Sequence, residues 1–143
     1  MSDFSYLLDT NVVSEGLKPN PDPAVMQWMD DTPTHSLYLS VVTIGELVRG
    51  ITKQAGTKRG LALKQWFEKI LIPDFQGRIL PLQEAEMRIW GEQYARAAAR
   101  GFTPPILDSL LAATALHHGL VLVTRNTKDL VMLPVTMLNP WLE

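Results

Sequence analysis

Three acidic residues stand where short apolar runs meet segments with helical spacing. Asp9 ends an apolar run, Glu46 follows a second one, and Asp108 opens a stretch rich in leucine and alanine. A carboxylate is costly to bury without a partner, so several acids beside apolar segments suggest that they share a cation. Oxygen ligands suit Mg²⁺, which keeps several waters in its shell, and Mn²⁺ is the alternative ion.

Each of these acids also has a purely structural explanation. Asp9, in Asp9-Thr10-Asn11, fits a turn or a helix cap, and Glu46 fits a capping box that begins at Thr43. Asp108 complements the dipole at the start of a helix. Three separate explanations must all hold for the structural interpretation, whereas one shared site accounts for all three acids.

The length and composition predict one domain spanning residues 1–143. The chain has 143 residues and 46% hydrophobic content, which is enough for one core. It has no cysteine, so disulfides and thiolate metal sites are excluded. The start, Met1-Ser2-Asp3-Phe4-Ser5, lacks the pattern of a signal peptide, and no apolar run reaches the length of about 18 residues that suggests a membrane helix. We therefore expect a cytoplasmic protein without a membrane partner.

The histidines and the charge pattern give little sign of a binding site. His35, His117 and His118 are too few and too poorly placed for a predicted zinc site, and the last two are interpreted as the polar end of a helix before Gly119. The net charge is −2, so any nucleic-acid binding must be local. Six basic residues between Arg49 and Lys69 face only Glu68 as an opposing charge, and they fit either a solvated helix face or a phosphate-contacting surface.

Short apolar runs alternate with longer helical patterns along the chain. The expected strands cover residues 6–8, 37–39, 78–80, 120–124 and 135–138, and the expected helices cover 23–29, 43–53, 61–70, 83–100 and 104–118. Within the fourth helix, Met87, Trp90, Tyr94 and Ala97 share one face. Alternation of this kind predicts a three-layer α/β/α fold with a mostly parallel sheet.

The last of these helices has clear boundary signals. Thr103 is the expected cap before Pro104 and Pro105, and Gly119 can take the left-handed conformation that ends the helix. Asp108 then lies near its amino end. In open α/β sheets, ligands bind beyond the carboxyl ends of the strands, and Asp9 and Asn126 both fall there.

Four motifs in this order carry a resemblance to a known family over essentially the whole chain. They are Leu7-Leu8-Asp9-Thr10-Asn11-Val12-Val13-Ser14-Glu15, Leu39-Ser40-Val41-Val42-Thr43-Ile44-Gly45-Glu46-Leu47, Asp108-Ser109-Leu110-Leu111-Ala112-Ala113-Thr114-Ala115 and Val123-Thr124-Arg125-Asn126, followed by Asn139-Pro140-Trp141. In combination they closely resemble PIN-domain ribonucleases. The nearest group is the VapC-like toxins of toxin–antitoxin pairs, especially the branch with FitB-like plasmid-stability proteins.

The resemblance implies site residues. Asp9, Glu46 and Asp108 match the family's acidic metal-binding and catalytic positions, and Asn126 falls where many members have a fourth aspartate. An asparagine offers an amide oxygen without a charge, so it would hold a second metal more weakly. Asp129 is an alternative fourth residue, but we favour Asn126 as a neutral ligand or water-positioning group.

The resemblance also implies an activity and partners. The expected enzyme is a Mg²⁺-dependent endoribonuclease in which a metal-activated water attacks the phosphodiester in line. Glu46 is one candidate for the proton acceptor, a role that the sequence leaves open. The expected partners are single-stranded or looped RNA, a cognate antitoxin and a second copy of the chain. Five aromatic residues support the homodimer, because one small core need not absorb Trp28, Trp66, Phe67, Trp90 and Trp141.

Two other functions are compatible with parts of this pattern. An aspartyl-phosphate phosphatase would use Asp9 as its nucleophile, but that chemistry usually needs an acid two residues later, where this chain has Asn11. A non-catalytic PIN-fold binding module is the second alternative, and the uncharged Asn126 keeps it open.

Overall fold

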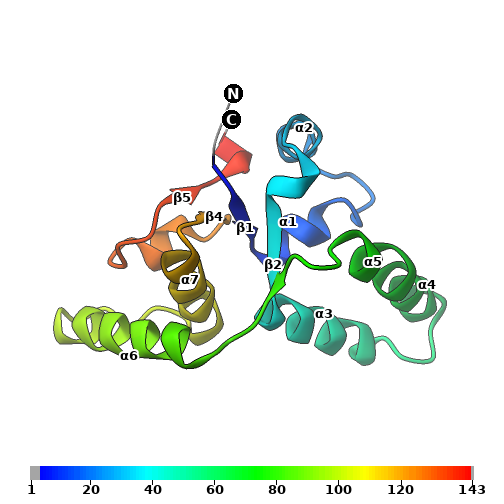
Figure 1. The fold of residues 1–143 in the computed structure, drawn as a ribbon. Coiled ribbons are helices and arrows are strands. Elements are labelled where there is room, and N and C mark those ends of the chain that lie inside the picture. The colour runs from blue at the N-terminus through cyan, green and yellow to red at the C-terminus, as the bar shows by residue number, and fades with distance from the viewer. Residues whose placement is uncertain (1–3, 143) are drawn as a thin grey trace.

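The computed structural model describes residues 4–142, which contain a five-stranded sheet in the order β3-β2-β1-β4-β5 (Figure 1). All four strand pairs are parallel. The strands are β1 (Tyr6–Leu8), β2 (Leu37–Ser40), β3 (Ile79–Leu80), β4 (Val121–Val123) and β5 (Met137–Leu138). Because every pair is parallel, the carboxyl ends of all five strands meet at one edge of the sheet.

Helices cover both faces of this sheet. The α-helices are α1 (Thr10–Glu15), α2 (Pro23–Asp31), α3 (Val41–Lys53), α4 (Lys58–Trp66), α5 (Ile72–Asp74), α6 (Glu84–Ala99) and α7 (Ile106–His118). A π-helix, η2 (Phe67–Leu71), joins α4 to α5, and three short 3₁₀ turns are η1 (Thr34–Ser36), η3 (Thr127–Leu130) and η4 (Pro140–Leu142). Figure 1 shows α6 and α7 on one side of the sheet and α1 to α5 on the other.

Adjacent strand residues divide the core into two halves. Leu7 packs with Leu111 of α7 in one cluster, whereas Leu8 packs with Val12 of α1 and Leu47 of α3 in the other. Successive side chains of a strand point to opposite faces, so a strand buried on both faces must be apolar throughout. The predicted α/β/α architecture is confirmed, and the sheet is wholly parallel.

The ends of α7 differ in how well the sequence predicted them. Gly119 has a φ of 67° and ends the helix in the left-handed region, as expected. The predicted cap at Thr103 is wrong, because the helix begins at Ile106 after an extended Pro105 and has no side-chain cap. A proline disfavours the helical conformation in the residue before it, so the Pro104-Pro105 pair holds the preceding backbone extended.

No helix among residues 4–142 is long and apolar enough to cross a membrane. Residues 1–3, on which part of the signal-peptide argument rested, lie outside the described residues.

Candidate active site

Asp9 sits at the junction of β1 and α1. Its backbone N–H donates to the carbonyl of Val123 at 2.9 Å, which ties it to β4. One carboxylate oxygen, Oδ1, accepts from the N–H of Thr10 at 2.6 Å and caps α1. The other, Oδ2, accepts from the hydroxyl of Thr124 at 2.7 Å. The helix-cap interpretation is therefore confirmed for one oxygen only, and the side chain as a whole is 3% exposed.

Glu46 projects from α3 toward the same point. Helix α3 begins at Val41 with Ser40 as its cap, so the predicted capping box between Thr43 and Glu46 is wrong. The strand before it ends at Ser40, which places the cap three residues earlier than the sequence pattern suggested. Glu46 Oε1 instead accepts from the hydroxyl of Thr10 at 2.6 Å. Thr10 thus links the first two acids.

Asp108 and Asn126 complete the group. Asp108 lies in the first turn of α7, and its Oδ2 accepts from Asn126 Nδ2 at 3.2 Å. The backbone N–H of Asn126 donates to the hydroxyl oxygen of Thr124 at 3.0 Å. All four predicted residues therefore lie on one hydrogen-bond path that runs from Glu46 through Thr10, Asp9, Thr124 and Asn126 to Asp108.

Thr10 and Thr124 are the connecting residues, and the sequence predicted neither of them as a site residue. Their signal was present, because each hydroxyl residue stands directly beside or just before a predicted site residue. Asp129, the alternative fourth acid, is exposed in η3. Its charge contributes to raising the pKa of Asp108, so it lies near the site.

Burial and mutual repulsion perturb the acids. Desolvation by burial is the largest cause that raises the pKa of Asp9 to about 6, and the charges of Asp108 and Glu46 add to it against the opposing hydrogen bonds. Burial also raises the pKa of Asp108, with Glu46 contributing. Acids that resist ionisation in this way lack a neutralising charge, so a divalent cation fits this donor set.

Asp9, Glu46 and Asp108 do not form the compact three-ligand group found among residues 4–142. In residues 4–142, the group of three His, Asp or Glu side chains whose donor atoms all lie within 4.8 Å of one another is at the other end of α7, not here. Mg²⁺ usually keeps several waters and takes one or two carboxylates directly. The arrangement is therefore compatible with an ion that reaches some of these acids through water.

Residues 6–130 match the model of the PIN domain family. The chain belongs to the PIN-domain family. It is similar to Toxin FitB of Neisseria gonorrhoeae, at 36% identity over 135 residues that cover 94% of this chain and 97% of that protein. It is also similar to VapC ribonuclease Y4jK of Sinorhizobium fredii, at 35% identity with 94% and 96% coverage.

A solved structure agrees with this assignment. The crystal structure of FitAcB from Neisseria gonorrhoeae superposes with a TM-score of 0.91 at 36% identity, covering 95% of this chain and 98% of that one. The predicted membership of the VapC-like, FitB-containing group is confirmed.

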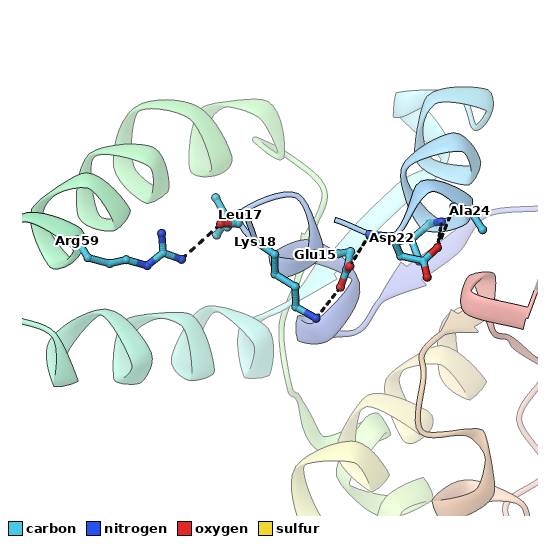
Figure 2. Close-up of polar contacts among 7 residues, drawn as sticks. Glu15, Leu17, Lys18, Asp22, Ala24 and Arg59 are labelled. Atoms are coloured by element: carbon cyan, nitrogen blue, oxygen red, sulfur yellow. Dashed lines mark hydrogen bonds and ion pairs between the residues drawn. The ribbon is translucent and has the colours of Figure 1, made fainter. Parts of the chain in front are cut away.

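A buried acid braces the loop of this PIN domain that follows α1 (Figure 2). Glu15 Oε2 accepts from the backbone N–H of Asp22 at 2.8 Å, and its Oε1 lies 2.9 Å from Lys18 Nζ. These contacts, led by the Asp22 N–H, lower the pKa of Glu15. Arg59 of α4 donates to the carbonyl of Leu17 at 3.4 Å, so α4 is joined to the same loop.

This loop borders a cleft next to the acids. The cleft has a volume of about 270 Å³, and its lining includes Thr10 and Glu46 together with Lys18 and Arg59. The other basic residues of the stretch between Arg49 and Lys69 are exposed on the surface. Of the six basic residues, Arg59 lines the cleft beside the candidate site, and Lys58 and Lys64 line a separate groove. The phosphate-contacting interpretation therefore applies to Arg59.

Proposed function

We propose that this PIN domain, spanning residues 1–143 and acting in the cytoplasm, is a Mg²⁺-dependent endoribonuclease and the toxin of a type II toxin–antitoxin pair. The observation that carries the proposal is the unbroken hydrogen-bond path between Glu46 and Asp108. The names of the relatives, a toxin and a VapC ribonuclease, support the same activity.

In this proposal Asp9 and Asp108 hold the cation, and Glu46 reaches it directly or through a water. The bound ion would polarise a phosphate oxygen and lower the pKa of a water for in-line attack. Thr10 and Thr124 fix the orientation of the Asp9 carboxylate, each through one oxygen. Asn126 positions Asp108 by donating to it and adds no further negative charge.

Residues that line the cleft would supply the proton acceptor and the contacts to phosphate. Glu46 borders it and is half-buried, so its carboxylate is placed to accept a proton from the attacking water. Lys18 and Arg59 would contact phosphates of a single-stranded or looped RNA. Arg59 reaches the loop through a long hydrogen bond of 3.4 Å, which leaves most of its guanidinium donors available.

We further propose that the cognate antitoxin docks at a groove between α3 and α4. The groove has a volume of about 650 Å³, and its lining includes Val48, Leu61 and Phe67. Val48 and Leu61 are exposed large apolar side chains, which favours an interaction surface. Lys58 and Lys64 also line it, so an apolar segment with acidic flanks is the complementary partner.

The homodimer remains a prediction. Its sequence argument is weaker in the structure, because all five aromatic residues are partly buried within the chain. Four of them pack against the core cluster beside Leu8, and Trp90 donates to the hydroxyl of Ser109 at 2.8 Å. Sedimentation at high micromolar concentration tests it, and a monomer there would contradict it.

An Asp108→Asn variant tests the nuclease proposal, with the exposed Asp30→Asn as the matched control. Asp108→Asn should abolish Mg²⁺-dependent RNA cleavage and leave the melting temperature unchanged or higher, because one source of carboxylate repulsion disappears. Asp30→Asn should cleave at the parent's rate. A variant at Asp108 that melts lower yet cuts normally would refute the metal-ligand role. A parent chain that cleaves no RNA with Mg²⁺ or Mn²⁺ would favour the non-catalytic binding module.

A further inference from the structure

A second cluster of metal-binding side chains lies at the opposite end of α7 from Asp108. The donor atoms of Glu86, His117 and His118 all lie within 4.8 Å of one another. From the sequence, His117 and His118 are expected to form the polar end of a helix rather than a zinc site. In the structure α6 packs against α7 and brings Glu86 beside them.

Glu86 is buried more deeply than the carboxylate of an ordinary surface ion pair. Its side chain is 2% exposed, and its Oε2 lies 3.3 Å from His118 Nε2. The other oxygen, Oε1, is buried without a hydrogen bond of normal geometry in the described part of the chain. A buried carboxylate therefore lies beside the two histidines.

The histidines are arranged around this carboxylate. Adjacent residues of a helix normally point in different directions. Here the two rings lie 4.8 Å apart at 78°, in the last turn before the left-handed Gly119. Zinc bonds to nitrogen and oxygen of about 2.0 to 2.1 Å put neighbouring tetrahedral ligands about 3.3 Å apart. The separation of 3.3 Å between Glu86 Oε2 and His118 Nε2 already matches that spacing.

We propose that Glu86, His117 and His118 bind a divalent transition-metal ion of the Zn²⁺ type. Two imidazoles and one carboxylate favour Zn²⁺ over Mg²⁺ and leave a fourth position for water. A cavity of about 280 Å³ lined by His118, Ser5 and Gly119 gives access from solvent. The ion ties the start of α6 to the end of α7, about 15 Å along the helix from Asp108 at 1.5 Å per residue. It is therefore separate from the proposed nuclease centre.

Titration of Zn²⁺ into the full-length chain, followed by calorimetry, tests the proposal. The expected result is one ion per chain, and Co²⁺ at the same site should give the visible absorption of a four-coordinate complex. His117→Gln and His118→Gln should each weaken binding by at least about 100-fold, because losing even a residue behind a ligand costs about 10- to 100-fold. His35→Gln, which removes the exposed third histidine, should bind as the parent does.

Two further measurements separate the site from its rivals. Zn²⁺ should raise the melting temperature of the parent but not of His117→Gln, in which the replaced side chain is exposed. Binding that is lost in Asp9→Asn and retained in His117→Gln would place the ion at the nuclease centre and overturn the proposal. An unchanged affinity in both histidine variants, or no saturable Zn²⁺ binding by the parent, would reduce the cluster to an interhelical ion pair. None of these outcomes depends on RNA cleavage.

Discussion

Thr124 donates its hydroxyl to Asp9 Oδ2 at 2.7 Å, across 115 positions of the sequence. The same hydroxyl oxygen accepts from the N–H of Asn126 at 3.0 Å. Thr124 therefore joins the end of β1 to the loop after β4, and it does so only because those strands are neighbours in the sheet. The geometry of the candidate site is thus a direct product of the β1–β4 pairing.

Replacing Thr124 with valine should shift the pH dependence of RNA cleavage. The Thr124 hydrogen bond lowers the pKa of Asp9, so its loss should raise that pKa further above its present value of about 6. Asp9 would then ionise at a higher pH, and the acidic limb of the pH–rate profile should move upward. The variant should also lose about 1 to 3 kcal/mol of stability, because the Asn126 N–H loses its acceptor.

Thr114→Val is the matched control for this experiment. Thr114 is a buried threonine whose hydroxyl donates to the carbonyl of Leu110 within its own helix. Its replacement should leave the pH–rate profile in place. If both variants keep the parent's profile, Thr124 does not tune Asp9.

Asp9→Asn should stabilise the metal-free protein in a defined pH range. Below about 3.8, Asp9 is protonated in both the folded and the unfolded chain and has no effect. Between about 3.8 and 6 the unfolded chain ionises first, so rising pH costs the parent stability. Above about 6 the penalty is constant, at up to about 3 kcal/mol from about 1.4 kcal/mol for each tenfold change in proton affinity.

Urea unfolding of parent and variant from pH 3.5 to 8, in a chelator, measures this difference. The free energy of unfolding of the variant should exceed that of the parent by an amount that grows between about pH 3.8 and 6 and is constant above that range. Saturating Mg²⁺ should reverse it, because only the parent gains binding energy from the ion. A variant that is less stable than the parent at pH 8 without metal would show that the cap and hydrogen bonds of Asp9 outweigh its desolvation.

The sequence predicted the elements well where chemistry is local. The apolar runs located all five strands, and Gly119 ended its helix as expected. The failed cap at Thr103 has a local cause, the Pro104-Pro105 pair, whereas the error at Glu46 arose because a tertiary contact decides the role of that side chain. Thr43 and Glu46 fit a capping box, yet the helix starts earlier and Glu46 accepts from Thr10. No local pattern encodes that contact between α1 and α3.

Helix α6, which corresponds to the helix predicted over residues 83–100, shows the same limit of sequence-based prediction. Its predicted apolar face held Met87, Trp90, Tyr94 and Ala97, and Ala97 is indeed buried. Met87, however, is 41% exposed, while the neighbouring Glu86 is 2% exposed. Burying an acid costs free energy unless a partner compensates for it. The partner of Glu86 is His118, which comes from another helix, so helical periodicity alone cannot predict that Glu86 is buried. The Glu86 cluster could therefore be found only in three dimensions.

Asn126→Asp should strengthen Mg²⁺ binding and lower the stability of the metal-free protein. The Asn126 amide now donates to Asp108 at 3.2 Å, so an aspartate would place a like charge against it. We expect a lower melting temperature without metal and a larger rise on adding Mg²⁺ than in the parent. Asn20→Asp adds the same charge on an exposed loop and should change neither value. A variant whose Mg²⁺-dependent rise equals the parent's would remove Asn126 from the metal's surroundings.

Leu61→Glu should separate antitoxin binding from RNA cleavage. Leu61 is 59% exposed and lines the groove between α3 and α4, so a charge there should disrupt docking of an apolar segment without harming the core. Co-purification with the cognate antitoxin should be lost, and cleavage by the variant should no longer be inhibited. Its uninhibited cleavage rate should equal the parent's, because Leu61 does not line the cleft beside Glu46.

Ala62→Glu provides the comparison for that last experiment. Ala62 is the next residue of α4 and is also exposed, but it does not line the groove. The two variants carry the same added charge one position apart, so general electrostatic repulsion of an acidic partner would weaken both equally. A specific docking groove predicts that only Leu61→Glu escapes the antitoxin. Equal inhibition of both variants at the parent's level would show that the antitoxin binds elsewhere on the domain.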